Sequence, residues 1–574
     1  MKRTSYWSLP ILLLAVLSSC IDKNYDLSDI DTTTEIKVTD LVIPINLDEV
    51  TLGDIISIKE GSELRKVTIN GETFYAVDKS GEFSSEKIHI AEFQAPAPVV
   101  TPSVISYTGL PSTGGIDVKF PLNQIAETTV DYEASDIDAS IVSISALFIK
   151  PVVIDIRFSS ADYSHMDFVS LTDLNIDFLK GLIVDADASG NVIYEPDSGQ
   201  LNIKKLQFGK DGTVTVTLPV NGIKKLERAF NANHELSIKE QIVVNKADIN
   251  IKSAQGLPSN ISITIDYIFP EFDFIGFSGV VKYDLEGISI APVVLNSLPD
   301  FLAGEETNLV LANPQIYLSL NNPMASYNLS FQTGISITPI HDYDAGPEAS
   351  LMLDKGFFEV SATGGTQNFV LSPEKPSNIP ADFEQNISWE PFTALSSVVE
   401  GPGIPKELTL DIVNPRVPEQ KVDHFMLNTD LDGVVGKWEF LAPLAMKEGA
   451  DSKIVYADRK TGWNDEDVDA IKISKLVLTM TVDNNLPLNA VLSGSPLGLD
   501  GNAIPGVSIK PVELKANTTG QEVELSVEGT VTHLDGFEFA ATVTSSSGVV
   551  LSPAQTLKLH NIRCRVSGSY IKKL

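Results

Sequence analysis

The chain has 574 residues and a formal net charge of −34, with 42 lysines and arginines against 76 aspartates and glutamates. A surface this acidic repels nucleic acid, so a nucleic-acid-binding function is excluded. Because the chain is too long to fold around a single hydrophobic core, we expect several domains. With only two cysteines, Cys20 and Cys564, we expect no disulfide framework.

The first 19 residues have the pattern of an export signal. Lys2 and Arg3 precede an apolar run, Leu9 to Leu17, that is shorter than the about 20 residues a spanning helix needs. The run ends in Leu17-Ser18-Ser19-Cys20, which resembles the lipobox of bacterial lipoproteins. This resemblance implies a mature chain that begins at Cys20, carries acyl chains such as palmitate there, and is held on a membrane by them. The alternative is a plain secretory signal followed by a chance cysteine.

Residues 20–34 are rich in acids and poor in core-forming side chains, which is typical of a solvated tether. The run is similar to the acid-rich leader of surface-exposed lipoproteins of the Bacteroidota, although Ile21 comes first and Lys23 interrupts the acids. The similarity implies an outer-membrane location. Whether the protein faces outward or toward the periplasm stays open.

From Glu35 onward, apolar and polar residues alternate, as in residues 213–218, 261–265, 317–320 and 523–527. Alternation with many β-branched residues predicts half-buried antiparallel strands. Helical spacing is brief, around residues 219–230, 294–302 and 392–399. We therefore predict an all-β protein of tandem antiparallel β-sandwich domains with a few short connector helices.

Proline and turn-rich segments suggest three β domains after the tether, at residues 35–125, 126–340 and 341–574. The first boundary comes after the turn Pro111–Gly115, and the second lies at the loop His341–Pro347.

Three strands run into an asparagine-proline corner, at Asn414-Pro415, Asn322-Pro323 and Asn485-Leu486-Pro487. Proline ends strand pairing, and asparagine can bond its own backbone. The shared strand and corner suggest that the three segments belong to related sandwich units. This pattern is also similar to the core of late-embryogenesis-abundant and water-stress domains, which are small sandwiches without enzymatic activity.

A candidate calcium loop consists of Asn428, Asp430, Asp432 and Glu439, with Gly433 at the turn. Oxygen ligands at alternate positions and a carboxylate at the twelfth fit such a loop. The flanks look like strands, however, and Asp-Gly between strands favours a hairpin. Residues 185–191 offer the same two interpretations, a calcium loop or a hairpin, but Pro196 stands at the twelfth position, where the calcium loop needs a carboxylate. We expect no other cofactor.

No segment has the pattern of an active site, so we expect no enzyme. Gly276-Phe277-Ser278-Gly279 begins like a nucleophile elbow, but Val280 replaces the closing glycine. The acids at 465–469 read as a solvated helix start. Cys564 alternates with Ile562 and Val566, which predicts a buried strand position.

Three functions remain. The first is a noncatalytic binding or structural role at the outer membrane, with an envelope protein as partner. The second is a carrier of a lipid or other hydrophobic ligand. The third is surface glycan binding. Sugar-binding platforms need exposed tryptophans and tyrosines, and the only tryptophans left after removal of the signal are Trp389, Trp438 and Trp463.

Overall fold

The computed structural model describes residues 33–44, 62–110, 116–121, 125–165, 168–185, 187, 189–228, 230–253, 258–295, 298, 300–463, 471–544 and 549–573. The signal segment, Cys20 and the tether up to residue 32 lie outside the described residues, as does the acidic run at 465–469. No helix in the described ranges is long and apolar enough to cross a membrane.

The protein is all-β, as the alternation predicts, and its described strands form five sheets. The pairs that they form are antiparallel, whereas β22 (Thr366–Ser372) and β23 (Ile387–Pro391) pair in parallel. The helices of the described part are single turns, namely α2 (Asp300–Ala303), η2 (Ala161–His165), η3 (Ala325–Tyr327), η4 (Ala381–Phe383) and η5 (Thr393–Ser397). The turn expected at residues 392–399 is present as η5, whereas residues 219–228 continue a strand. That strand stays extended through Pro219 because it pairs with its neighbour on both sides of the proline.

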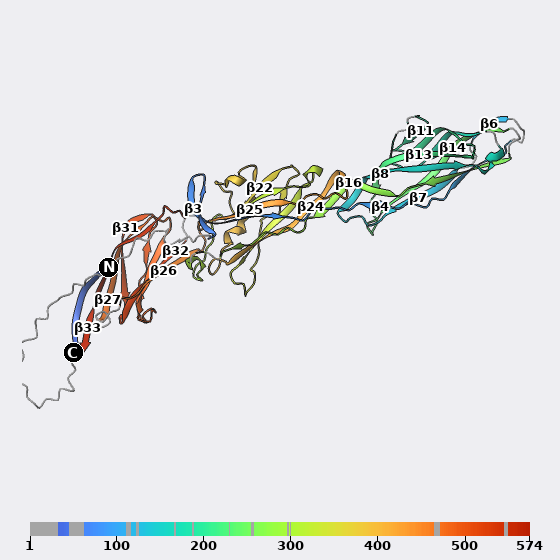
Figure 1. Cartoon of the computed structure of the whole chain (residues 1–574). Helices are drawn as coiled ribbons and strands as arrows, with labels where there is room; N and C mark the ends of the chain where they lie inside the picture. Colours follow the sequence, from blue (N-terminus) through green and yellow to red (C-terminus); the bar gives the residue numbers. More distant parts are fainter. Residues whose placement is uncertain are drawn as a thin grey trace, which may run out of the picture. The chain divides into compact units, whose positions relative to one another are not determined.

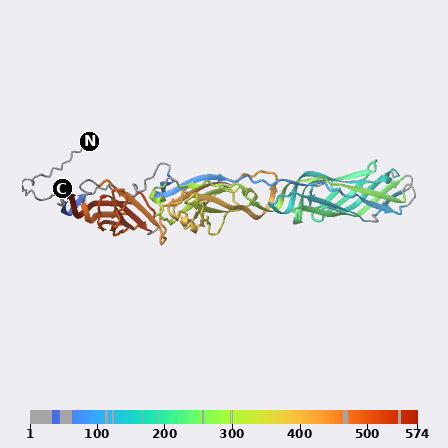
Figure 2. The same cartoon turned by 90° about the horizontal axis from the view of Figure 1, so that it is seen from below.

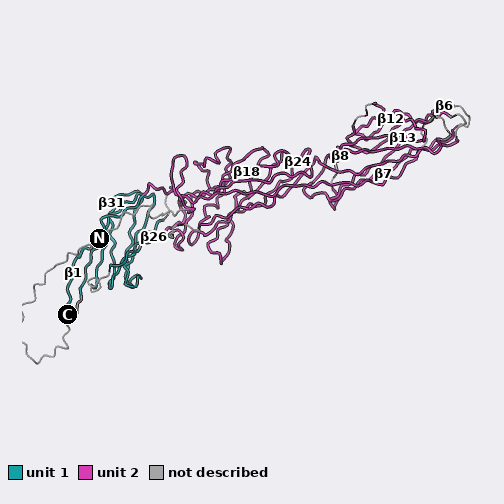
Figure 3. Tube along the Cα trace, viewed as in Figure 1, with its two compact units in different colours: residues 1–51, 455–543, 556–574 teal, residues 52–454, 544–555 magenta. Residues whose placement is uncertain are grey.

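The chain divides into two compact units, coloured separately in Figure 3. Unit 1 comprises residues 1–51, 455–543 and 556–574, and unit 2 comprises residues 52–454 and 544–555. This division does not follow the expected boundaries at 125 and 340. The strands of residues 35–125 are shared among four sheets, because their hydrogen-bonding partners lie far along the chain.

Unit 1 is a sandwich of two sheets around one apolar core. Sheet I consists of β1 (Thr33–Pro44), β33 (Leu557–Lys573), β27 (Ile471–Asn484), β31 (Thr518–Glu528) and β29 (Ser508–Ile509). Sheet II consists of β26 (Lys453–Lys460), β32 (Leu534–Thr544), β28 (Ala490–Gly498) and β30 (Val512–Leu514). β1 pairs with β33, so the first and last described strands are neighbours.

Cys564 is confirmed as a buried strand residue of this core, with Ile562 and Val566 buried on the same face. Burial raises the pKa of its thiol to about 12, so it stays protonated.

Unit 2 contains three sheets, and sheet III extends through the whole unit. Its path is β10 (Leu182–Val184), β13 (Thr213–Arg228), β8 (Ile141–Ser159), β16 (Phe272–Asp284), β24 (Glu407–Met426), β19 (Phe331–Ile340) and β20 (Leu351–Met352). Off this path lie β15 (Asn260–Ile268), β5 (Ser103–Thr108), β17 (Val293–Val294), β21 (Phe358–Val360) and β4 (Phe93–Ala95).

Two smaller sheets pack on sheet III. Sheet IV consists of β11 (Val192–Glu195), β12 (Gln200–Gln207), β9 (Phe168–Asp177), β14 (Leu236–Ser253), β6 (Ile116–Phe120) and β7 (Ala126–Ala134). Sheet V consists of β2 (Leu64–Ile69), β3 (Glu72–Ser84), β25 (Val435–Pro443), β18 (Gln315–Asn321), β22 (Thr366–Ser372) and β23 (Ile387–Pro391). The blue β3 lies among the yellow and orange strands of sheet V (Figures 1 and 2).

Aromatic side chains join these layers. The Tyr107 hydroxyl on β5 donates to the Ala247 carbonyl of sheet IV at 2.9 Å. Phe358 on sheet III and Phe369 on sheet V have ring centroids 4.7 Å apart. Unit 2 is therefore a pair of sandwiches that share sheet III.

Two of the three predicted corners are present and use the same bonds, although in one of them the bonding residue is Asn484, one position before the predicted Asn485. Asn322 and Asn484 are 6% and 1% exposed. In each, the side-chain oxygen accepts from the backbone two residues on, and the amide donates to two carbonyls, at 2.7 to 3.1 Å. The third corner is wrong, because β24 runs on through Asn414 and Pro415. Asn414 has a φ of 46° and marks a bulge, near which β24 exchanges β19 for β16 as its partner.

Candidate functional site

The structure does not bring the predicted calcium residues together. Asp430 lies 3.0 Å from His89 Nδ1 and 3.6 Å from Lys87 Nζ, so an imidazole and an ammonium group already face its carboxylate. Glu439 lies in β25, paired across the sheet with Tyr317. Asn428 instead donates its backbone N–H to the Ile90 carbonyl. Among the described residues, no group of three or more His, Cys, Asp or Glu side chains is placed to hold a metal.

The hairpin alternative is also wrong for both segments. β24 and β25 belong to sheets III and V, so residues 427–434, which include Asp432, cross between the layers of a sandwich. Residues 185–191 likewise connect β10 of sheet III to β11 of sheet IV. In that crossover, the Asp187 carboxylate accepts from the Ser189 hydroxyl and from three backbone N–H groups. These bonds lower the pKa of Asp187 to about 2, and they show a carboxylate that shapes a loop.

Ser278 lies within β16, so the strand-turn-helix of a nucleophile elbow is absent there. Its hydroxyl donates to Asp423 at 2.7 Å and accepts the backbone N–H of His424 at 3.1 Å. The His424 ring stacks on Phe148, with centroids 4.0 Å apart. The three residues join β16 to β24, and no imidazole takes the serine proton.

The tryptophans do not form a shared platform. Trp438 is 2% exposed, and Trp463 packs against the core of unit 1. Trp389 is 36% exposed and donates its indole N–H to the Ser372 hydroxyl at 3.1 Å.

A cleft of about 460 Å³ opens beside sheet V, on the face opposite Trp438. We call it the sheet V cleft. Five chain segments, most of them far apart in sequence, form its walls. The lining residues are Ile69, Glu72, Thr73, Phe74, Ala312, Asn313, Gln315, Pro376, Ser377, Asn378, Leu441, Pro443, Ala445, Val550 and Ser552. Its size falls in the range of small-molecule sites.

Hydrogen bonds fix the cleft walls. Leu551 donates its N–H to the Leu444 carbonyl at 2.8 Å, and its own carbonyl accepts from Tyr75 at 3.0 Å. The Asn378 amide donates to Glu72 at 3.0 Å. An apolar wall thus carries a small number of fixed polar groups, which is the usual design of a ligand pocket.

Behind this wall lies Glu439, two residues from the lining residue Leu441 on the same face. Burial raises the pKa of Glu439 to about 7, with repulsion from Asp78 as the next cause and Arg65 opposing it. The Arg65 guanidinium binds Asp78 Oδ2, while Asp78 Oδ1 has no hydrogen-bond partner within the described ranges. Glu439 is therefore a carboxyl that changes charge near neutral pH beside a cleft, a feature that marks functional sites.

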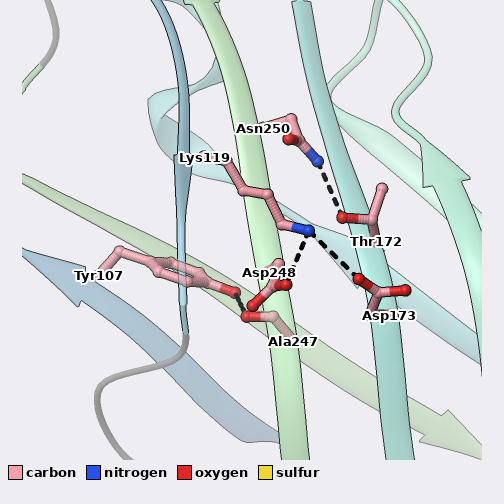
Figure 4. Close-up of polar contacts among 7 residues, drawn as sticks. All are labelled: Tyr107, Lys119, Thr172, Asp173, Ala247, Asp248 and Asn250. Atoms are coloured by element: carbon pink, nitrogen blue, oxygen red, sulfur yellow. Dashed lines mark hydrogen bonds and ion pairs between the residues drawn. The ribbon is translucent and has the colours of Figure 1, made fainter.

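The outer face of sheet IV is different, because several of its polar side chains bond one another (Figure 4). Lys119 on β6 reaches Asp248 at 2.9 Å and Asp173 at 3.2 Å, and Asn250 donates to Thr172 at 3.0 Å. A second cleft of about 370 Å³ lies here, lined by Asp173, Leu174, Asn175, Asn202, Ile203, Lys204 and Lys246. We call it the sheet IV cleft.

Sequence reasoning missed both clefts. The alternation in β9, β12 and β25 marks outward-facing positions, but it does not tell which of them share a cleft. The usable signal was the cluster of asparagines and lysines on the outward face of β12 and β14.

No family model matches the chain, and no curated protein matches it. Among solved structures, the chain is similar to a protein of Parabacteroides distasonis described as secreted, with 14% identity and a TM-score of 0.35 over 51% of this chain and 90% of that one. It is also similar to a structure from Sulfolobus Turreted Icosahedral Virus, with 8% identity and a TM-score of 0.12 over 82% of this chain and 100% of that one. A triple jelly roll protein of an archaeal virus has 9% identity and a TM-score of 0.11, over 83% and 90% of the two chains.

Proposed function

We propose that the protein is a noncatalytic, lipid-anchored protein of the cell envelope that binds a small amphiphilic ligand in the sheet V cleft. The observation that carries the proposal is the cleft itself, with its apolar wall and its fixed polar groups. A ligand with an apolar body and a hydrogen-bonding end complements both parts of this lining.

The anchor part of the proposal rests on the lipobox at Cys20. β1 begins at Thr33 and pairs with β33, so the tether would enter unit 1. Unit 2, which contains the cleft, would then be free of the attachment.

Membrane fractionation tests the anchor. The Cys20→Ala variant should move from the membrane fraction to the soluble fraction and lose incorporation of radiolabelled palmitate. A Cys564→Ala variant is the matched control and should stay with the membrane. An unchanged membrane fraction of Cys20→Ala would contradict the proposal.

Native mass spectrometry of the Cys20→Ala chain, purified by an affinity tag, tests the ligand. A fraction of the protein should carry an added mass that organic solvent extracts. Ala312→Trp should remove this mass, because Ala312 is a half-buried lining residue and indole fills the cleft. Ser388→Trp, at an exposed position in β23, is the control. A chain without an extractable mass, or with the same mass in Ala312→Trp, would contradict the ligand part.

A further inference from the structure

The sheet IV cleft combines a row of amides with unpaired cations. Asn175 donates to Asn202 at 2.7 Å, and Asn245 donates to Asn175 at 3.2 Å. This row crosses three neighbouring strands, β12, β9 and β14. Each amide offers both a donor and an acceptor, so the row can match the hydroxyl groups of a ligand.

Two lysines line the same cleft. Lys204 on β12 and Lys246 on β14 are exposed. The ion pairs present within the described ranges of unit 2 leave both ammonium groups without a carboxylate partner. In a chain of net charge −34, two unpaired cations in one cleft attract an anion that the rest of the surface repels.

Lys119 reduces the negative charge beside this cleft. The only carboxylate in the lining is Asp173, and Lys119 pairs with it and with Asp248 at once. The hydrogen bonds that Lys119 donates to these two carboxylates raise its pKa, with Asp248 as the larger contributor, so the lysine stays charged at neutral pH. Lys119 thereby neutralises one of these two negative charges, and the charges of Lys204 and Lys246 make the sum over these five groups positive.

We propose that the sheet IV cleft binds a small hydroxylated ligand that carries an oxyanion group, a carboxylate or a phosphate. Lys204 and Lys246 hold the oxyanion, and the Asn175–Asn202 pair bonds the hydroxyls. The described residues that line the cleft include no aromatic side chain, so charge and amide contacts supply the affinity and salt weakens it. The site is independent of the sheet V cleft.

Isothermal titration at low salt tests the proposal with four probes: glucuronate, glucose 6-phosphate, glucose and inorganic phosphate. At least one anionic sugar should bind, and comparison of the two identifies the preferred oxyanion. Glucose, without the charge, should bind about tenfold more weakly or not at all, since one lost charge-assisted contact costs about this factor. Inorganic phosphate should also bind more weakly, because it lacks the hydroxyl contacts.

Variants assign the contacts. The double variant Lys204→Ala/Lys246→Ala should lose at least about tenfold in affinity for the anionic sugar. Asn175→Ala should weaken the sugar but leave the affinity for inorganic phosphate unchanged. Lys239→Ala is the control, since Lys239 also lies on β14 but pairs with Asp131 at 2.9 Å, and it should change nothing. Equal binding of glucose, no binding of either anionic sugar, or unchanged affinity in the double variant would overturn the proposal.

Discussion

The outer faces of sheets IV and V each carry a nearly buried aspartate next to a cation, but their surroundings differ. Asp78 on sheet V and Asp248 on sheet IV have side chains 6% and 11% exposed. Beside Asp78 lies Glu439, whose pKa is raised to about 7 by burial and by Asp78 itself. Beside Asp248 lies Asp173, which is 53% exposed and shares Lys119 with it.

What covers each sheet explains the difference. Residues of η4 and its flanks pack on sheet V, and Phe383, Val370 and Tyr317 form a small apolar cluster there. The central polar positions of sheet IV remain open to solvent around their cleft. Two sheets built by the same alternation therefore acquire different chemistry. Burial and a neighbouring aspartate raise the pKa of Glu439 on sheet V, whereas the two aspartates of sheet IV share Lys119.

The largest expected effect is a difference in the free energy of unfolding between a variant on sheet V and a variant on sheet IV. Tyr317→Ala on sheet V should cost about 3 to 5 kcal/mol, because it removes a side chain of 0% exposure from an apolar cluster. Asn175→Ala on sheet IV should cost less than about 1 kcal/mol. Urea unfolding followed by tryptophan fluorescence measures both. Equal losses would break the comparison.

The pH dependence of stability is the next largest effect. The folded pKa of Glu439, about 7, lies above its ordinary value of 4.5, so ionisation costs more in the folded state. The penalty is absent below pH 4.5, grows between pH 4.5 and 7, and is complete above that range. The difference between these two pKa values corresponds to about 3 kcal/mol, and solvent screening of the half-buried carboxyl reduces it. Glu439→Gln should therefore be more stable than the native chain by about 2 kcal/mol at pH 8 and equal to it at pH 4.

Glu82→Gln is the control for this pair, because Glu82 lies on β3 of the same sheet with a side chain 75% exposed. The Glu82→Gln variant measures the effect of losing a surface charge without the loss of a buried one. A constant difference between Glu439→Gln and the native chain from pH 4 to 8 would refute the burial of Glu439.

A smaller effect isolates the part of Asp78. Asp78→Asn removes the negative charge that repels ionised Glu439, so the pKa of Glu439 should fall toward its ordinary value. The stability difference between Asp78→Asn and the double variant Asp78→Asn/Glu439→Gln should then still begin near pH 4.5, but it should be complete at a lower pH and be smaller. The same unfolding experiment, repeated across pH, measures it. An identical profile with and without Asp78 would leave burial as the sole cause.

The smallest effect is expected on sheet IV. Asp173→Asn breaks an exposed ion pair with Lys119, and such pairs add little to stability. Its urea midpoint at pH 7 should equal that of the native chain. A clear loss of stability would show that the Lys119 network holds the sheet together and is more than a surface arrangement.

Local pattern was enough to predict the strands and some of their special residues. Alternation identified Cys564 as buried, and the asparagine-proline pattern identified the corner at Asn322. It also located the corner before Pro487, but there the bonding residue is Asn484 and not the predicted Asn485. The same rule failed at Asn414, because two long partner strands keep β24 extended through Pro415. Proline stops a strand only where its missing N–H would break the pairing.

The candidate sites depended on partners that the sequence does not reveal. Phe74, Gln315, Leu441 and Val550 line one cleft although hundreds of positions separate the first from the last. Glu439 fitted a calcium loop by spacing, yet its position in β25 places it against Tyr317 and Asp78. Spacing describes a loop correctly only when the loop returns to the same sheet, and residues 427–434 cross to another.

The most direct test of the account is a titration with a neutral fluorescent amphiphile, such as N-phenyl-1-naphthylamine. The account predicts saturable binding with one site in the native chain and in Lys204→Ala/Lys246→Ala, and loss of that binding in Ala312→Trp. Ser388→Trp should bind like the native chain. Binding that survives in Ala312→Trp, or no saturable binding in the native chain, would contradict the assignment of the sheet V cleft.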